Sequence, residues 1–295
     1  MGVVSINPKE VETAKLHGLL LSAVAPRPIA FASTVDINGN VNLSPFSFFN
    51  VFSANPPILI FSPARRVRDN TTKHTLENAI ATKEVTINIV NFPIVEQMSL
   101  SSTEYDKGVN EFSKSGLTQV PSIKVKPPRV KESPVSFECI VENIMPLGEE
   151  GGAGNLIIAK VVMVHVDDTY TNKDGKLDTT KLDLVARMGE SWYCRASKDA
   201  LFEIPKPIFT KGIGVDKLPK HILESEILTG NNLGRLGNSE KLPTQEEIST
   251  FLENNIEVQT MINNKDIPAL HTKVKDFLKE ENVSKAILVA FSFIK

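Results

Sequence analysis

Four cations lie immediately before a predicted helix, and together they favour an anion site. The segment SPARRVRDNTTKHTLEN (residues 62–78) contains Arg65, Arg66, Arg68 and Lys73, with nearby hydroxyls at Thr71, Thr72 and Thr75. A helix N-terminus presents unpaired N–H groups and the positive end of the helix dipole, so it attracts anions. We therefore predict a site for one phosphate, at the scale of a mononucleotide cofactor, with His74 as a further donor. A solvated basic face without a ligand is the alternative interpretation.

A second set of side chains, earlier in the chain, could surround a flat ring. Small hydroxyl and amide residues stand beside an aromatic one at Ser33, Thr34, Asn42, Ser44, Ser47, Phe48, Asn50 and Ser53. A heterocycle with edge carbonyls and ring nitrogens needs apolar walls on its faces and neutral donors at its edges. We expect adjacent strands to bring these residues around a slot. A polar hairpin on an exposed sheet face is the alternative.

Other signatures of catalysis are missing from the sequence. GEEGGAGN (residues 148–155) and GNNLGRLGNS (residues 230–239) fit neither a P-loop nor a dinucleotide fingerprint, which argues against a Rossmann dehydrogenase. No G-x-S-x-G elbow is present, and the five histidines lack metal-ligand spacing, so we expect no metal site. His165 either lines the barrel or is structural. Cys139 alternates with apolar residues and is predicted to be a core thiol.

Composition narrows the class of protein further. The 295 residues carry 33 Lys+Arg and 35 Asp+Glu, a net charge of −2, which argues against a nucleic-acid partner. The longest apolar run, Ala286 to Phe291, is far shorter than a membrane span. The first residues show no basic region followed by an apolar one, as a signal peptide would. The expectation is a cytoplasmic protein with no membrane association.

The first two-thirds of the chain predict strands at short intervals. Asn38-Gly39 supplies the positive φ angles of a hairpin turn after the first strand. Strands at such intervals, with few helices between them, suggest a closed antiparallel barrel. The expected strands span residues 28–35, 42–50, 57–61, 84–90, 135–142, 156–166 and 182–188.

Two short helices are expected among these strands. One runs through KHTLENAIATK (residues 73–83), capped by Thr72 or Asp69, and the other begins at Pro93 and continues through Met98.

The pattern changes after about Arg195. Pro205, Pro207 and Pro219 mark loops, and Thr244 to Glu247 forms a capping box before a helix. Leu270, Val274, Phe277 and Leu278 make an apolar helical stripe, and Lys285 to Ile294 is predicted to close the chain as a strand. We therefore expect two domains, residues 1–199 and an α+β extension of residues 200–295.

Several segments, taken in order, resemble the flavin reductase-like family, whose members are FMN-binding split-barrel proteins related to flavoredoxins and NAD(P)H:flavin oxidoreductases. They are PRPIAFASTVDINGNVNLSPFSFFN, NPPILIFSP, KHTLEN, PPRVKESPVSFEC, VVMVHVDD and ARMGESWYCR, spread from about residue 20 to about residue 195. The resemblance implies a mainly β fold, an antiparallel Greek-key split barrel with short helices, on which the extension packs. It also implies a homodimer with FMN bound noncovalently near the subunit interface.

The same resemblance implies roles for individual residues. The isoalloxazine and ribityl chain would lie along Ser33, Thr34, Asn42, Ser44, Ser47, Phe48 and Asn50. The phosphate would lie near Ser62, Arg65, Lys73, His74 and Thr75. One departure is Gly189-Glu190, where family members often show paired glycines, because a Glu side chain there could narrow the ring pocket or repel an anionic reduced flavin.

The leading hypothesis is an FMN-dependent oxidoreductase in which NAD(P)H, a transient co-substrate, delivers a hydride to flavin N5. No catalytic side chain is assigned, since the flavin would carry the chemistry. Arg27, Arg187 and Arg195 are candidates for stabilising the negative charge near N1 and the C2 carbonyl. The alternatives are a flavoredoxin-like electron carrier that does not turn over NAD(P)H, and a non-catalytic split-barrel binding module. The electron-accepting partner is unassigned.

Overall fold

The first hairpin forms at the predicted Asn-Gly turn. In the computed structural model, which describes residues 2–205 and 211–293, β1 (Ala30–Val35) pairs antiparallel with β2 (Val41–Phe46). The Asp36 carboxylate accepts hydrogen bonds from the backbone N–H groups of Asn38 and Asn40, and Gly39 has a φ of 86°. This turn directs the chain back along β1 and fixes which residues of β2 face the helix that follows.

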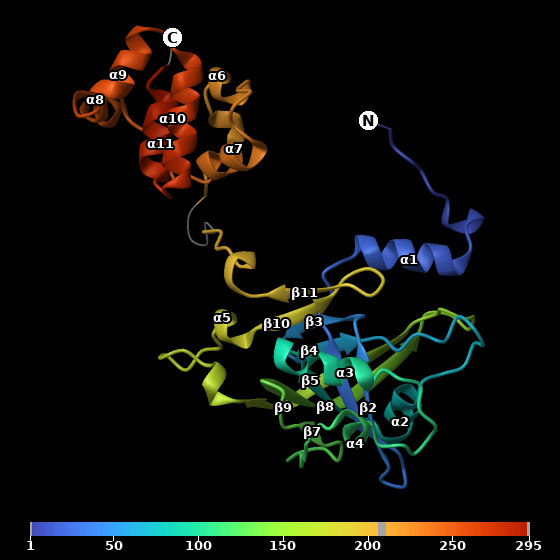
Figure 1. Ribbon diagram of the computed structural model, residues 1–295. Helices are drawn as coiled ribbons and strands as arrows, with labels where there is room; N and C mark the ends of the chain where they lie inside the picture. The colour runs from blue at the N-terminus through green and yellow to red at the C-terminus, as the bar shows by residue number, and fades with distance from the viewer. Residues whose placement is uncertain (1, 206–210, 294–295) are drawn as a thin grey trace. The chain divides into compact units, whose positions relative to one another are not determined.

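Seven strands form one antiparallel sheet with the order β2-β1-β5-β8-β9-β4-β3 (Figure 1). The remaining members are β3 (Phe49–Ala54), β4 (Pro57–Phe61), β5 (Glu84–Ile89), β8 (Val135–Pro146) and β9 (Asn155–Val166). The two edge strands, β2 and β3, are consecutive in the chain and are joined by Ser47 and Phe48 alone. The sheet must therefore curl until its edges meet at this corner. The edges do not pair with each other in the sheet, so the barrel is split and not closed as the strand spacing suggested.

The predicted antiparallel, mainly β fold with short helices is thus confirmed for this part of the chain. Two small ladders accompany the sheet: β6 (Gln119–Val120) with β7 (Arg129–Val130), and β10 (Leu184–Arg187) with β11 (Tyr193–Ala196). The helices are α1 (Thr13–Ala23), α2 (His74–Thr82), α3 (Val95–Leu100), α4 (Glu111–Ser115) and α5 (Thr179–Leu182).

The start of α2 differs from its prediction. The residue at its N-cap position is Lys73, which makes no side-chain capping bond. The Thr72 hydroxyl donates instead to Glu77, and the Asp69 carboxylate accepts from Thr71 and Arg68. Both predicted caps are therefore wrong, because each side chain has a partner elsewhere in the loop. The predicted helix at Pro93 is a 3-10 turn, Phe92–Ile94, that leads directly into α3.

Apolar side chains fill both sides of β1. Ala30 and Ala32 face a cluster that contains Phe61 of β4 and Leu76 of α2. Phe31 faces a second cluster, which contains Leu43, Met98 and Phe112. Because every residue of β1 is buried, this strand is the rigid support for β2 and α2, which flank the candidate site.

The chain divides into two compact units, residues 1–202 and 203–295, a few residues from the predicted boundary. The helices of the second unit are α6 (Lys220–Leu223), α7 (Gly230–Gly237), α8 (Gln245–Glu253), α9 (Ile256–Asn263), α10 (Ile267–Lys279) and α11 (Val283–Phe291). The capping box at Thr244 and Glu247 and the buried stripe of α10 are confirmed. How the extension packs on the barrel stays a prediction.

The α+β prediction for the second unit is wrong within its described residues, 203–205 and 211–293, which contain no strand. The predicted closing strand, residues 285–294, is helix α11 up to Phe291, and Ile294 lies outside the described residues, as does Pro207. Ala286, Val289 and Ala290 are fully buried in an apolar cluster. A short apolar run cannot be assigned to a strand or a buried helix from its periodicity.

None of the helices in the described ranges combines the length and apolar character that a bilayer crossing requires.

Candidate functional site

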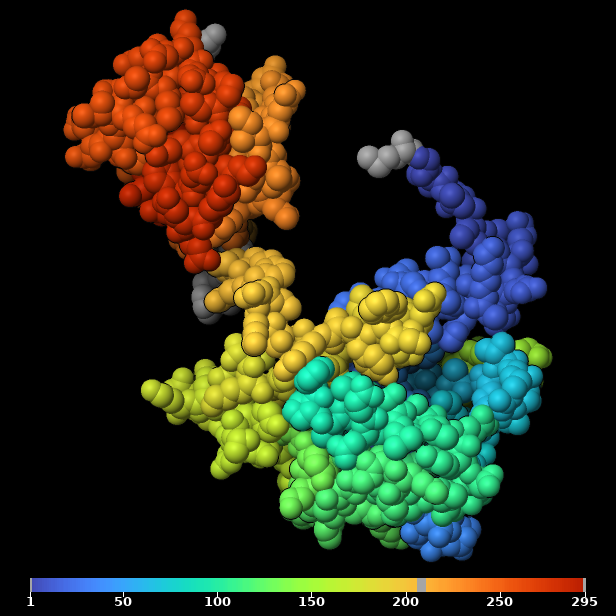
Figure 2. Space-filling view, in the orientation of Figure 1, coloured from blue at the N-terminus to red at the C-terminus, as the bar shows by residue number. Residues whose placement is uncertain are grey.

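A cavity opens at the corner where the two sheet edges meet. The backbone N–H of Ser62 donates to the Phe48 carbonyl at 2.9 Å, which ties the end of β4 to this corner. The cavity, called the corner cavity below, has a volume of about 310 Å³. Of the predicted residues, it is lined by Ser47, Phe48, Ser62, Arg65 and Lys73. In Figure 2 the surface is hollowed beneath the blue helix α1, beside the light-blue segment that follows β4.

A second cavity of about 320 Å³, called the helix-end cavity, lies at the N-terminus of α2. Its lining includes the predicted residues Asn42, Ser44, Lys73, His74 and Thr75. Arg66, Val67 and Lys73 line both cavities, so the two spaces are neighbours along one face of β2. The structure thus brings the predicted cationic segment to the predicted polar-aromatic segment.

Four residues of the predicted ring site, Ser33, Thr34, Asn50 and Ser53, line neither cavity. Ser33 is fully buried, and its hydroxyl has no hydrogen-bond partner among the described residues. Thr34 is also buried and accepts a bond from the amide of Asn78 in α2, which makes it part of the strand-to-helix packing. Asn50 is exposed on β3, where its side chain accepts from the backbone N–H of Val51. Their assignment to a ring site stays a prediction.

Buried amide and hydroxyl groups set the position of α2 above the sheet. The Asn42 amide of β2 donates to the Thr75 hydroxyl at 2.9 Å, and both side chains are buried. Because Asn42 and Thr34 are opposite each other across β1 and β2, their two bonds fix the first two turns of α2. Lys73 and His74 are consequently held at the mouth of the helix-end cavity.

The glycine-rich segment of residues 148–154, which matched no phosphate motif, supports the cationic loop. Arg65 N–H donates to the Ala153 carbonyl at 2.8 Å, and Gly152 N–H donates to the Arg65 carbonyl at 3.0 Å. A Cβ on Gly151 would lie 3.1 Å from two backbone carbonyls of that loop, and one on Gly154 would lie 2.7 Å from Ser62 Oγ. Glycine is needed here because the two backbones touch.

Two cations of this site have no ion-pair partner within the described ranges. Arg65 donates to the side chain and carbonyl of Asn70, which are both neutral. Lys73 lies over the Phe46 ring, with its Nζ 5.3 Å from the ring centroid. Burial, and then the positive charge of Arg66, lower the pKa of Lys73 below its usual value. A bound anion would relieve this unbalanced charge, so the residues present fit a phosphate group.

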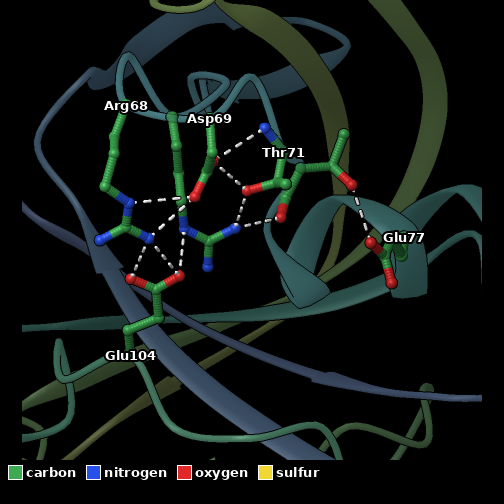
Figure 3. A network of polar contacts seen from close by, with 7 residues as sticks. Arg68, Asp69, Thr71, Glu77 and Glu104 are labelled. Atoms are coloured by element: carbon green, nitrogen blue, oxygen red, sulfur yellow. Dashed lines mark hydrogen bonds and ion pairs between the residues drawn. The ribbon is translucent and has the colours of Figure 1, made fainter.

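The other two arginines of the run are already paired. Figure 3 shows the Glu104 carboxylate between two guanidinium groups, with Asp69 accepting from Arg68 and Thr71. Glu104 lies 2.7 Å from Arg66 Nε and 3.1 Å from Arg68 Nη2. The cationic segment is therefore not a uniformly free basic surface.

Among the three candidate arginines for the ring, Arg27 is the one that contacts a residue of the corner cavity. Its guanidinium donates to the carbonyls of Leu21, Val24 and Met188, and its Nε lies 3.4 Å from Ser47 Oγ. Burial lowers the pKa of Arg27. These bonds hold the end of α1 against the corner.

The remaining candidates for the ring have other partners. Arg195 pairs with Asp183 at 2.7 Å, and Arg187 lies over the Tyr193 ring. Glu190 is exposed, with a φ of 51°, so its side chain does not fill either cavity.

His165 has a structural role. Its Nε2 is 2.6 Å from Glu138 Oε1, and Glu138 is fully buried. The same carboxylate accepts from the backbone N–H groups of Ile123 and Lys124. Within the described part of the chain, no three His, Cys, Asp or Glu side chains gather where they could hold a metal ion.

The sequence did not indicate the contribution of α1. His17 and Leu21 line the corner cavity, and the His17 ring meets the Phe48 ring edge-on at a centroid distance of 6.3 Å. The apolar run Leu19-Leu20-Leu21 after Thr13 was the available signal. Since α1 has no fully buried residue, its pattern was too weak to assign to a core-facing helix.

Comparison with known proteins defines the class. Residues 22–181 match the model of the flavin reductase like domain. The chain is 36% identical over 211 residues to an uncharacterised protein of Halalkalibacterium halodurans, covering 70% of this chain and 99% of the relative.

Two solved structures are similar as well. Nitrilotriacetate monooxygenase component B from Bacillus cereus has 30% identity and a TM-score of 0.64, covering 69% of this chain and all of that one. A putative flavin reductase with a split barrel domain from Shewanella frigidimarina has 32% identity and a TM-score of 0.56. The match covers 67% of this chain and 94% of that one.

The chain belongs to the flavin reductase-like family, and its first unit is a split barrel of the flavin-binding oxidoreductase type.

Proposed function

We propose that the first unit binds FMN and reduces it with NAD(P)H. The observation that carries the proposal is the convergence of Arg65 and Lys73, two cations without an ion-pair partner in the described residues, on a cavity that also holds Ser47 and Phe48. A phosphate monoester carries up to two negative charges at neutral pH, which matches the two cations.

Each part of the site has a task in this proposal. Arg65, Lys73 and the Ser62 hydroxyl bind the phosphate, and His74 and Thr75 lie at the adjoining helix start. Ser44 and Ser47 provide neutral donors along the face of β2, and Phe48 provides an apolar wall. When bound, FMN supplies the hydride-accepting atom and passes the electrons on.

Arg27 is the residue we assign to the negative charge that reduction creates. Its guanidinium is fixed by three backbone carbonyls and reaches Ser47, so it is a preorganised positive charge at the corner. The side chain need not move a proton, since it stays charged at neutral pH.

NAD(P)H is the proposed transient co-substrate. The sequence lacks a dinucleotide fingerprint, which is compatible with a nicotinamide that only needs to stack against the exposed face of a flavin. Delivery of electrons to a separate acceptor, and location in the cytoplasm, stay predictions from the sequence.

A homodimer would complete the ring end of the site. Phe48 is 38% exposed, and Val51 and Phe52 on the edge strand β3 are 64% and 63% exposed. Contiguous apolar side chains on an exposed edge strand are a surface that proteins normally cover. We propose that a second copy of the chain covers them, and Phe52→Asp is expected to lower the mass measured by light scattering.

The decisive test is the visible spectrum of the protein with FMN, recorded anaerobically before and after NADH or NADPH is added. Loss of the oxidised flavin absorbance, faster than for free FMN, is the expected result. No acceleration with either nicotinamide would contradict the proposed activity. Reduction only by a reduced protein partner would favour the electron-carrier alternative, and failure to retain FMN would favour a binding module for another ligand.

A further inference from the structure

Glu104 lines the same cavity as Lys73, one of the two cations that the proposed function assigns to the phosphate. Its carboxylate contacts Arg66 and Arg68 (Figure 3). All three side chains line the helix-end cavity. Arg66 also lines the corner cavity together with Lys73. A negative charge of the chain itself therefore occupies a position next to the predicted phosphate site.

Arg66 does not depend on Glu104 for its position. Its Nη1 donates to the Thr71 hydroxyl at 2.9 Å and to the Thr72 carbonyl at 2.5 Å. Two bonds to a planar guanidinium hold it in the loop, since the group is rigid. Glu104 contacts a different nitrogen, Nε, so its contribution is mainly to the charge balance and not to the geometry.

The charge balance changes when a phosphate is present. Without a ligand, Arg66 and Lys73 repel each other, and this repulsion helps to lower the pKa of Lys73 while Glu104 opposes it. A phosphate bound near the same cations removes the repulsion, and Glu104 then becomes a like charge close to the ligand. The Glu104 side chain is 49% exposed, so no close packing forces it to stay between the two arginines.

We propose that Glu104 competes inside the molecule with the flavin phosphate for the charge of Arg66, and thereby weakens FMN binding so that the flavin exchanges readily. The inference rests on the proposed function, because it concerns the same phosphate site.

The test compares wild type with Glu104→Gln, using FMN and riboflavin as the two probes. Riboflavin has the same ring but lacks the phosphate. We expect the variant to bind FMN about fivefold more tightly at low salt, because the substitution removes the repulsion between an exposed carboxylate and the phosphate dianion. Riboflavin binding should not change. The gain should shrink towards zero near 1 M salt, where the screening length is about 3 Å.

A second readout separates this role from a structural one. Without flavin, Glu104→Gln should lower the thermal midpoint slightly, because the cations lose their counter-charge, although the variant binds FMN better. Glu257→Gln, which removes an exposed, lysine-paired carboxylate from the other unit, is the matched control and should change neither property.

The outcomes are distinct. Unchanged or weaker FMN binding by Glu104→Gln, with wild type binding FMN, overturns the inference and leaves the proposed function intact. Equal changes for FMN and riboflavin also overturn it, since they indicate a loop rearrangement. If wild type binds neither flavin, both proposals fail together.

Discussion

Lys73→Ala is expected to weaken FMN binding about 30-fold and to leave riboflavin binding unchanged. A hydrogen bond to a charged partner contributes about 1.5–3 kcal/mol, and about 2 kcal/mol corresponds to that factor. The fold should tolerate the change, because Lys73 makes no capping bond and its ammonium is repelled by Arg66. Loss of the contact with the Phe46 ring should lower the free energy of unfolding by about 0.5–1 kcal/mol.

The assay is titration of protein with each flavin, followed by quenching of flavin fluorescence. Lys220→Ala, which removes an exposed lysine of the second unit, is the control for the loss of one charge. Equal losses for the two flavins, or unchanged FMN affinity, would refute the placement of the phosphate beside Lys73.

The pH dependence of FMN binding tests the same lysine. The pKa of Lys73 is lowered from 10.5, chiefly by burial, so the ammonium is present below the lowered value and is lost as the pH rises through it. FMN affinity should therefore fall at a lower pH than for an ordinary lysine. Lys73→Arg should remove this fall, because a guanidinium stays charged.

Three further predictions concern stability. Glu138→Gln should cost about 3 kcal/mol in urea unfolding, since it removes the charge of a fully buried carboxylate that contacts the partly exposed His165, and a cost below about 1 kcal/mol would contradict this role. His221 and His271 hydrogen-bond each other, and burial lowers the pKa of both side chains from 6.5. Their stabilisation of the second unit is therefore present above pH 6.5 and is lost as the pH falls through the pKa values of the folded state. Thermal unfolding at pH 7.5 and pH 5 should show this loss. Gly154→Ala should cost about 1–3 kcal/mol by the same urea assay and weaken FMN binding, because its Cβ meets Ser62 Oγ; full stability would show that the two loops can separate.

Local signals in the sequence predicted most of the first unit. The turn at Asn38-Gly39 and the alternating strand at residues 135–142 are each determined by residues close together in the sequence, and both are present in the structure. The split between β2 and β3 was not derivable from strand spacing, because it depends on which distant strands pair. β4, for example, pairs with β9 and not with the strand that follows it.

The second unit was harder because its apolar runs are short. Residues 286–291 are apolar throughout, which fits a strand or a helix buried on several sides, and Asn282, whose side chain accepts from Lys285 N–H, was the capping signal that could have decided.

The residue types of the candidate site could be predicted from the sequence, but the pairing of its charged side chains could not. Residue types alone located Arg65 and Lys73 near Ser47, yet the pairing of Arg66 and Arg68 with Glu104 joins residues more than thirty positions apart.

Ser47 and Phe48 are the covalent link between the two edge strands, β2 and β3, which do not pair with each other. Covalent geometry limits the separation of the two strand ends here, because the three Cα–Cα steps from Phe46 to Phe49 can span only about 10 Å when fully extended. Inserting residues between Ser47 and Phe48 should thus widen the corner cavity and let it admit bulkier rings. The size of the ligand could then be changed at this link without altering the strands of the sheet.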